Sequence, residues 1–406
     1  MKLKRILAAL LALLLALSLA ACAKAPASPT DAPSPAPTEA APEPSAAPAV
    51  PDGVPEIEGL VYESTVPLTY ADQFAIYKYE GGYEYIDMVN SDRILIVPEG
   101  GSVPAGLDRD VVVLQRPIEN VYLAATSAMA LIDAVGALDA LDFVGSRTWY
   151  TENAIRALET GDVIYAGKYN APDYEMLMNG KCGLAIESTM ILHNPDVREK
   201  LIEVGIPTII ERSSYEDHPL GRTEWVKVYG ALFGREAEAE AAFEEQVDKV
   251  RALEAIDGTG KTVAFFYVNT SGSVVTYKTN GYVPAMIRLA GGEYVFSDLG
   301  LGDDSKLSTI NMSMEQFYAE AASADVIIYN CSIASQLYTL EDLISLSPVL
   351  ADFRAVREGN AWCTTDSMFQ QTDKMGSIIQ EMNAIFSGTT DGSDLEYMFR
   401  LEREGA

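Results

Sequence analysis

Side chains that could carry out chemistry are scarce in this chain. It has two histidines, His193 and His218, and it has no HExxH, GxSxG or Walker A motif. A serine or cysteine nucleophile would need one of these two imidazoles within reach as its general base. His193 precedes an Asn-Pro pair, and His218 begins the segment His-Pro-Leu-Gly-Arg, so we interpret both as polar loop residues. The sequence therefore predicts a protein that is not an enzyme.

The same residues argue against a bare transition metal as the ligand. Proteins that capture zinc or manganese combine several histidines with carboxylates, and two distant histidines are too few. A haem needs only one or two axial ligands, so His218, a tyrosine or a methionine leaves haem open. We expect no resident cofactor and no metal ion held by the protein alone.

The cysteines beyond the N-terminal region are Cys182, Cys331 and Cys363. The first two stand in apolar, strand-like runs, where a buried cysteine usually acts as a small hydrophobic residue. The three are odd in number and show no CxxC spacing. A disulfide is possible outside the cytoplasm, but the spacing does not establish one.

The charge balance argues against a nucleic-acid partner. The chain has 29 Lys and Arg against 59 Asp and Glu, a formal net charge of −30. Binding to phosphates requires a basic surface, which this composition does not provide.

The N-terminal region has the features of an export signal. Lys2, Lys4 and Arg5 precede an apolar run that ends in small residues at Leu19-Ala-Ala-Cys22. This ending resembles the lipobox of bacterial lipoproteins, which implies a signal peptide over residues 1–21 and a lipid on Cys22. A plain secretory peptide is the alternative. Residues 22–59 are rich in Pro and Ala and predict an unfolded tether that anchors an extracytoplasmic protein to the cell membrane.

The stretch at residues 221–256 predicts a helical connector. Its apolar residues recur every three or four positions, at Trp225, Tyr229, Leu232, Ala239, Phe243, Val247, Val250 and Leu253. Gly234 is placed to end a first helix near Phe233, and a second helix should run from about Glu236 to Ile256. An ordinary surface helix of one large domain is the alternative interpretation.

Short apolar runs alternate with helical patterns on both sides of this connector. The alternation predicts two α/β lobes with central parallel sheets. We expect a small β extension at residues 60–110 with a Gly81-Gly82 turn, an N-terminal lobe at 111–222, connecting helices at 223–257 and a C-terminal lobe at 258–406. Parallel sheets bind ligands at the carboxyl ends of their strands, so the expected site is the cleft between the lobes.

Residues that directly follow the expected strands are the candidates for ligand binding. Aromatic rings with a few fixed polar groups suit a large metal chelate, and Arg147 and Arg212 could contact an anionic siderophore. The full set is Arg147, Trp149, Tyr150, Glu187, Ser188, Arg212, Tyr215, Asn269, Ser271, Tyr282, Asn330, Ser332 and Phe369.

Four segments resemble one family of known proteins. They are Glu216-Asp-His-Pro-Leu-Gly-Arg-Thr-Glu-Trp225, Ala290-Gly-Gly-Glu-Tyr-Val-Phe296, Pro172-Asp-Tyr-Glu-Met and Ser313-Met-Glu-Gln-Phe. With them the chain resembles the substrate-binding lipoproteins of ABC importers for iron–siderophores, haem or cobalamin. The resemblance implies two Rossmann-like lobes joined by one long α-helix and a metal-chelate ligand, a ferric siderophore before haem or cobalamin.

The resemblance also implies a partner, an ABC permease with its ATPase, and we expect the chain to be a monomer. In the family a glutamate on each lobe meets permease arginines, and the matching residues here are Glu175 and Glu315. Helix N-termini favour glutamate in any case, which is the simpler explanation of both positions. The chain departs from the family after Glu175, where Leu177-Met-Asn-Gly-Lys replaces the usual Leu-x-Pro-Asp-Leu. A surface adhesion or scaffold lipoprotein on the same fold is the alternative function.

Overall fold

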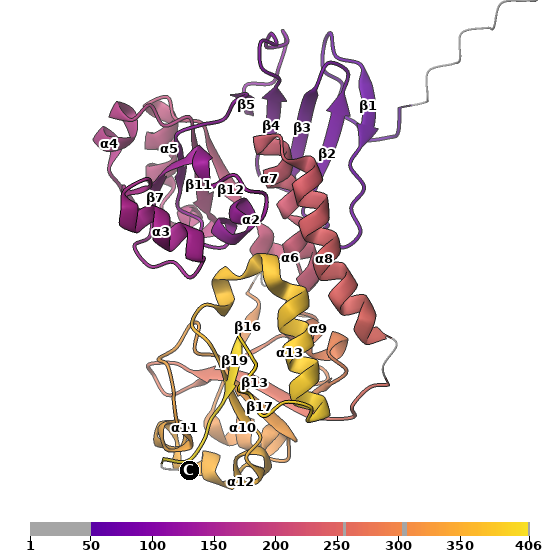
Figure 1. The fold of residues 1–406 in the computed structure, drawn as a ribbon, viewed down its shortest axis with the longest axis vertical. Helices are drawn as coiled ribbons and strands as arrows, with labels where there is room; N and C mark the ends of the chain where they lie inside the picture. Colours follow the sequence, from indigo (N-terminus) through magenta and orange to yellow (C-terminus); the bar gives the residue numbers. More distant parts are fainter. Residues whose placement is uncertain (1–49, 255–256, 303–306, 405–406) are drawn as a thin grey trace, which may run out of the picture. The chain divides into compact units, whose positions relative to one another are not determined.

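The computed structural model describes residues 50–254, 257–302 and 307–404 (Figure 1). The expected signal peptide, the expected lipidation site at Cys22 and most of the expected tether lie outside these residues. The chain from Asp52 onward forms one compact unit. Within the described residues, no helix is both long and apolar enough to cross a membrane.

The first element of this unit is a five-stranded sheet. Its strands are β1 (Tyr62–Thr65), β2 (Phe74–Tyr79), β3 (Tyr83–Met88), β4 (Arg93–Val97) and β5 (Val111–Gln115), in that order. Gly81 and Gly82 both have φ of 82° and turn the chain between β2 and β3, as the sequence predicts. The expected extension ended at residue 110, but β5 pairs in parallel with β4 and so belongs to this sheet.

The first lobe has a five-stranded sheet in the order β12-β11-β6-β7-β8. All its neighbours pair in parallel, which confirms the parallel sheet predicted from the alternating pattern. The strands are β6 (Val121–Leu123), β7 (Leu141–Val144), β8 (Ile164–Tyr165), β11 (Leu184–Ser188) and β12 (Thr208–Glu211). The helices are α2 (Ala128–Ala134), α3 (Glu152–Thr160), α4 (Tyr174–Asn179) and α5 (Pro195–Glu203), with a small ribbon of β9 (Gly167–Lys168) and β10 (Ala171–Pro172) and the short helices η1 (Leu138–Ala140), η2 (Thr189–His193) and η3 (Ser213–Tyr215).

The connector consists of α6 (Pro219–Glu224), α7 (Val226–Phe233) and α8 (Glu236–Glu254). Gly234 ends α7 with φ of 67°, in the left-handed region, as predicted. The apolar face of α8 is buried in the same core as that of α7, with Phe243 1% exposed. The expected helix end at Ile256 lies just outside the described residues.

The second lobe has a seven-stranded sheet in the order β16-β14-β13-β17-β18-β19, with β15 paired to β13. Its centre is parallel, whereas β14, β16 and β19 are antiparallel additions. The strands are β13 (Thr262–Val268), β14 (Val274–Tyr277), β15 (Glu293–Tyr294), β16 (Thr309–Met312), β17 (Val326–Tyr329), β18 (Ala361–Thr364) and β19 (Met398–Arg400). The helices are α9 (Tyr282–Leu289), α10 (Met314–Ala321), α11 (Leu340–Leu346), α12 (Arg354–Glu358), α13 (Met375–Ser387), η4 (Pro348–Asp352), η5 (Met368–Gln370) and η6 (Thr372–Lys374).

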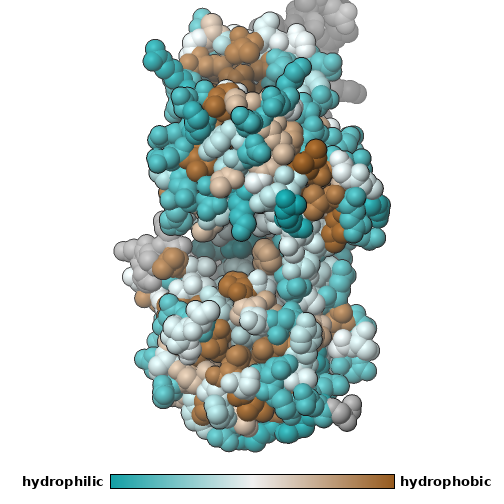
Figure 2. Space-filling view, turned by 90° about the vertical axis from the view of Figure 1, so that its left-hand side faces the viewer, coloured by the Kyte–Doolittle hydropathy of each residue, from teal (hydrophilic) through white to brown (hydrophobic). Residues whose placement is uncertain are grey.

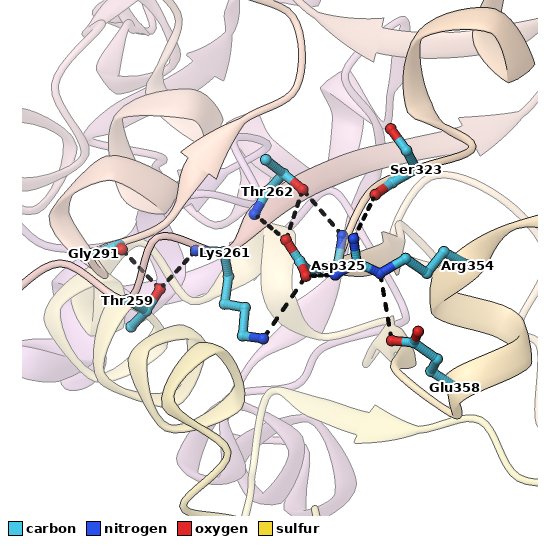
Figure 3. Close-up of polar contacts among 8 residues, drawn as sticks. All are labelled: Thr259, Lys261, Thr262, Gly291, Ser323, Asp325, Arg354 and Glu358. Carbon is cyan, nitrogen blue, oxygen red and sulfur yellow. Dashed lines mark hydrogen bonds and ion pairs between the residues drawn. The ribbon is translucent and has the colours of Figure 1, made fainter.

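Asp325 fixes the amino-terminal edge of this second sheet (Figure 3). Its Oδ2 accepts hydrogen bonds from the backbone N–H of Thr262 at 3.0 Å and from the Thr262 hydroxyl at 2.9 Å. Its other oxygen pairs with Arg354 of α12 and lies 3.7 Å from Lys261. These contacts hold the starts of β13 and β17 together. They fix the relative position of two strands whose opposite ends lead to the site.

The segment Glu216–Trp225 fastens the β extension to the connector. The buried carboxylate of Glu224 accepts hydrogen bonds from the backbone N–H groups of Thr69, Tyr70 and Ala71, at 2.8–2.9 Å. Glu216 likewise accepts from the N–H groups of Asp72 and Gln73 and from the Trp225 indole, at 2.9–3.1 Å. We call residues 69–73 the strap, because they lead into β2 and are held by these two carboxylates.

His218 belongs to the same clamp. Its ring stacks on Tyr70 with 4.5 Å between the ring centroids, and its Nδ1 accepts the Leu220 N–H at the start of α6. Burial lowers the pKa of this imidazole. A neutral ring that caps a helix agrees with the predicted role of a polar loop residue.

Candidate functional site

A pocket of about 210 Å³ lies where strands and loops of the two lobes meet. Figure 2 shows a hollow at mid-height of the molecule, with hydrophilic and hydrophobic residues side by side at its edge. From the first lobe and α6 the pocket is lined by Thr126, Ser127, Ser213, Ser214 and Arg222. From the second lobe it is lined by Phe265, Tyr282, Asn330, Ser332, Met368, Phe369, Thr372 and Met375.

Arg222 is the one fully charged side chain among the described residues that line this pocket. Its Nε donates to the Glu216 carbonyl at 3.1 Å, and its Nη2 donates to the Ser214 carbonyl at 2.7 Å. The guanidinium lies 3.5 Å from the centre of the Tyr282 ring. Burial lowers the pKa of Arg222, yet an arginine remains charged at any physiological pH. The pocket therefore carries one fixed positive charge, stacked on an aromatic ring.

Glu211 orients Ser127 and Ser213 on the first-lobe side of the pocket. It lies at the end of β12 and is 3% exposed. The Ser127 hydroxyl donates to its Oε2 at 2.8 Å, and the Ser213 N–H donates to its Oε1 at 2.7 Å. Because its proton is engaged, the Ser127 oxygen is oriented to accept a hydrogen bond from a ligand.

Asn330 organises the opposite wall. It directly follows β17 and is 3% exposed. Its Nδ2 donates to the Tyr277 hydroxyl at 3.1 Å, and its Oδ1 accepts from the N–H of Ser332 at 3.1 Å and from the Ser332 hydroxyl. Burial raises the pKa of Tyr277, so this phenol remains a neutral hydrogen-bond partner.

Tyr150 connects the two lobes beside the pocket. Its hydroxyl donates to Asp366 at 2.8 Å, and its backbone N–H donates to the Gln370 side chain at 3.2 Å. Gln370 in turn donates to the Thr148 carbonyl at 3.3 Å, and the rings of Tyr150 and Phe369 meet edge to face. Burial and the hydrogen bond to Asp366 raise the pKa of Tyr150 to about 12. The loop after β7 thus touches the loop after β18.

Four of the predicted ligand-binding residues line the pocket: Tyr282, Asn330, Ser332 and Phe369. A fifth, Tyr150, makes the contacts between the lobes just described. All five follow the carboxyl ends of strands, where parallel sheets bind ligands.

Trp149 and Glu187, two further predicted residues, are buried and lie outside the lining of the pocket. Trp149 is 5% exposed, packs in the main core, and donates its indole N–H to the Ser146 carbonyl at 3.0 Å. Glu187 is fully buried, and both its carboxylate oxygens lack a hydrogen-bond partner among the described residues. It lies on the same face of β11 as Ala185, which packs with residues of α4 and α5.

The remaining predicted residues also lie outside the lining of the pocket, and several have structural partners. Arg147 lies 4.0 Å over the Tyr165 ring, and Arg212 lies 4.4 Å over the ring of Tyr215. Asn269 accepts from the N–H and hydroxyl of Ser271 and closes the turn between β13 and β14. Ser188 ends β11 and precedes η2.

Sequence reasoning missed all five residues that line the pocket from the first lobe and α6. Thr126 and Ser127 follow β6, so the strand-end rule could have found them. Arg222 belongs to the His-Pro-Leu-Gly-Arg segment, which indicated the family resemblance but not a role of its arginine in the pocket. Met368, Thr372 and Met375 had no local signal, because η5, η6 and the start of α13 reach the pocket only through the tertiary fold.

Glu175 and Glu315 occupy equivalent positions on the two lobes. Each is exposed and is the second residue of its helix, α4 and α10 respectively. Asp173 caps α4, and Ser313 caps α10 in a reciprocal pair with Gln316. Backbone and Ser313 hydrogen bonds lower the pKa of Glu315, so its carboxylate is ionised at neutral pH.

No group of three or more His, Cys, Asp or Glu side chains among the described residues could hold a metal ion. The groups that face the pocket are instead hydroxyls, amides, aromatic rings, methionines and one guanidinium. Such a set can bind an organic molecule by stacking and hydrogen bonding. Two α/β lobes with such a pocket at their strand ends define a bilobal substrate-binding protein.

Residues 124–366 match the sequence model of the periplasmic binding protein family, and the chain belongs to this family of substrate-binding proteins. An uncharacterized lipoprotein of Methanocaldococcus jannaschii is 27% identical over 275 residues, which cover 64% of this chain and 62% of the relative. The match therefore spans less than two thirds of that relative's own length.

Solved structures share the fold. A periplasmic binding protein from Veillonella parvula superposes with a TM-score of 0.55 at 18% identity, covering 78% of this chain and 98% of that one. The periplasmic heme binding protein HutB of Vibrio cholerae gives 0.54 at 17% identity over 65% and 98% of the two chains. The petrobactin-binding protein YclQ of Bacillus subtilis gives 0.53 at 12% identity over 68% and 93%. These likenesses establish the architecture of both lobes.

Proposed function

We propose that this chain is the substrate-binding component of an ABC importer and that it captures a metal chelate. A ferric siderophore is favoured over haem and cobalamin. The observation that carries the proposal is the pocket at the strand ends of both lobes, with Arg222 stacked on Tyr282 and hydroxyl groups opposite. A cation, several hydroxyls and aromatic rings suit an anionic, aromatic or amide-rich chelate better than a bare ion.

The size of the pocket bears on how a ligand enters. Its 210 Å³ is below the range of about 300–1,000 Å³ that is usual for ligand sites. The contacts of Tyr150 and Gln370 hold the lobes together beside it. A chelate would enter after these few hydrogen bonds open, and they would form again around the bound ligand.

Delivery would follow at the membrane. Under this proposal Glu175 and Glu315 dock onto arginines of a permease that works with an ATPase, each forming a charge-assisted pair. The lipobox at Cys22 would keep the protein extracytoplasmic and anchored, and the lipoprotein names of the archaeal relatives support this location.

A binding titration tests the proposal. The chain without signal and tether is titrated calorimetrically with haemin, cobalamin and a panel of ferric siderophores. One compound should bind saturably with one site per chain, and Tyr282→Ala or Ser332→Ala should weaken it at least tenfold. Arg156→Ala is the matched control, because Arg156 is exposed and lies outside the pocket.

Absence of saturable binding across the panel, or binding that ignores both pocket variants, would contradict the proposal. The adhesion or scaffold lipoprotein on the same fold would then be the better candidate.

A further inference from the structure

The Cys331–Cys363 disulfide lies directly against the ligand wall of the second lobe. Cys331 stands between Asn330 and Ser332, which both line the pocket. Cys363 is in β18, which leads to the pocket residues Met368 and Phe369. Both cysteines are almost fully buried, and their Cα atoms are 6.4 Å apart.

The disulfide lies where the pairing of β17 with β18 ends and the loops after these two strands begin. The parallel pairing of β17 with β18 ends at the pair Tyr329↔Cys363, so Asn330 and the residues after it lie beyond the ladder. Past this point, the Cys331 N–H donates to the Thr364 hydroxyl oxygen at 3.0 Å. The covalent bond reinforces the same junction.

The segments that follow Cys331 and Cys363 have little regular secondary structure. Residues 331–338 form turns and coil, with Ile333 56% and Tyr338 71% exposed. On the other side, the loop after Cys363 carries Asp366 and Gln370, which make the hydrogen bonds to the first lobe. The disulfide therefore joins the start of the loop that carries Ser332 to the strand before the loop that contacts the first lobe.

We propose that Cys331 and Cys363 are positioning residues of the ligand site. The inference rests on the proposed function and deepens it: the disulfide holds the loops after β17 and β18 in the geometry that presents Ser332 and Phe369 to the ligand. It touches no ligand itself and acts through its neighbours. Its removal leaves the sheet intact and loosens the two loops.

Hydrogen exchange tests this positioning without any ligand. In the Cys331→Ser/Cys363→Ser variant of the full chain, amides of residues 330–338 and 365–371 should exchange at least tenfold faster, while those of β13 and β17 remain unchanged. Cys182→Ser is the matched control, because Cys182 is a buried free thiol of the first lobe. If the serine pair does not fold, Cys331→Ala/Cys363→Val leaves no buried hydroxyl and replaces it.

Binding provides the second readout. For the compound from the panel that binds the unaltered chain, the disulfide-free variant should bind at least tenfold more weakly, mainly through faster dissociation. Ser332→Ala should weaken binding clearly in the disulfide-bonded chain and only slightly in the variant, where the loop that carries Ser332 is loosened. A purely structural disulfide would lower the melting temperature and leave this difference at zero.

The two arms separate the failure of this inference from the failure of the proposed function. Equal exchange of both loops with and without the disulfide would overturn the positioning role. If no compound binds the unaltered chain, the proposed function fails, and the exchange experiment still decides whether the disulfide orders these loops.

Discussion

Glu187 is a buried carboxyl group that has no hydrogen-bond partner in the part of the chain that the structure describes, and its protonation should affect stability. Burial raises its pKa from 4.5 to about 8, and the phenols of Tyr122 and Tyr174 feel its charge. Between these two pH values the folded chain holds a proton that the unfolded chain has released. Stability therefore falls as the pH rises from 4.5 to 8, and the loss is complete above the folded-state pKa.

Replacing this carboxyl group should remove that pH dependence. In Glu187→Gln the free energy of unfolding at pH 8 should exceed that of the unaltered chain by about 2–4 kcal/mol, with little difference at pH 5. Urea unfolding at pH 5, 6.5 and 8 measures the effect. Glu175→Gln on the exposed surface should change nothing. An identical pH profile for Glu187→Gln and the unaltered chain would show that Glu187 ionises freely.

Residues that follow strands were predicted to bind ligand, and the surroundings of each strand end explain why only some of them line the pocket. Asn330 and Ser332 follow a strand that ends at the cleft, and they line the pocket as predicted. Glu187 is the second-to-last residue of β11, whose two faces are both buried, so alternation did not reveal which face its side chain would take. Trp149 stands in a loop that folds back into the core, because its large apolar surface is better buried than exposed.

At the scale of elements, the strap and the connector depend on each other. Glu224 is fully buried and accepts hydrogen bonds from the N–H groups of three successive strap residues. The Lys227 Nζ lies 3.2 Å from its Oε1. Hydrogen bonds to a buried charge contribute more than neutral ones, and removing one partner leaves the others unsatisfied.

Truncation of Glu224 should therefore be costly. Glu224→Ala should lower the free energy of unfolding by about 3–5 kcal/mol, because Lys227 and the strap N–H groups lose their buried acceptor. Chemical denaturation measures the loss, and limited proteolysis should reveal new cleavage within residues 66–73. Glu240→Ala is the control, since Glu240 also pairs with Lys227 but is half exposed. Equal stabilities of the two variants would contradict the clamp.

Elements differed in how well the sequence predicted them. The end of α7 at Phe233 and the start of α8 at Glu236 were predicted, because the apolar spacing and Gly234 are local signals, whereas the separate helix α6 was not predicted. The pairing of β5 with β4 and of Cys331 with Cys363 was not predicted, because both join segments whose approach is set by the fold. The antiparallel edges of the second sheet were missed for the same reason.

At the scale of the whole molecule, the contact of Tyr150 with Asp366 should regulate ligand exit. Tyr150→Phe keeps the ring and loses one hydrogen bond worth about 1 kcal/mol, so dissociation of a bound chelate should become about fivefold faster. Asp366→Asn should act similarly, and the double variant should add little. Stopped-flow displacement measures these rates. Tyr338→Phe, at an exposed tyrosine outside the pocket, should leave them unchanged. Fully additive effects would mean that the two side chains act separately.

Docking should depend on both lobes at once. The variant Glu175→Ala/Glu315→Ala should lower uptake of the ligand by cells at least tenfold, because each lobe loses one charge-assisted pair with the permease, while the dissociation constant of the ligand remains unchanged. Paired substitution of two other exposed glutamates, Glu152→Ala/Glu358→Ala, provides the control. Uptake at full strength in the first variant would remove the docking step from the proposed function.

The clamp on the strap also limits how this protein can be shortened. The family match begins at residue 124, so a minimal version would discard the β extension and the strap with it. Such a truncation would leave the carboxylates of Glu216 and Glu224 beside the connector without the strap N–H groups that now donate hydrogen bonds to them. A shortened chain would therefore need apolar or amide replacements at both positions.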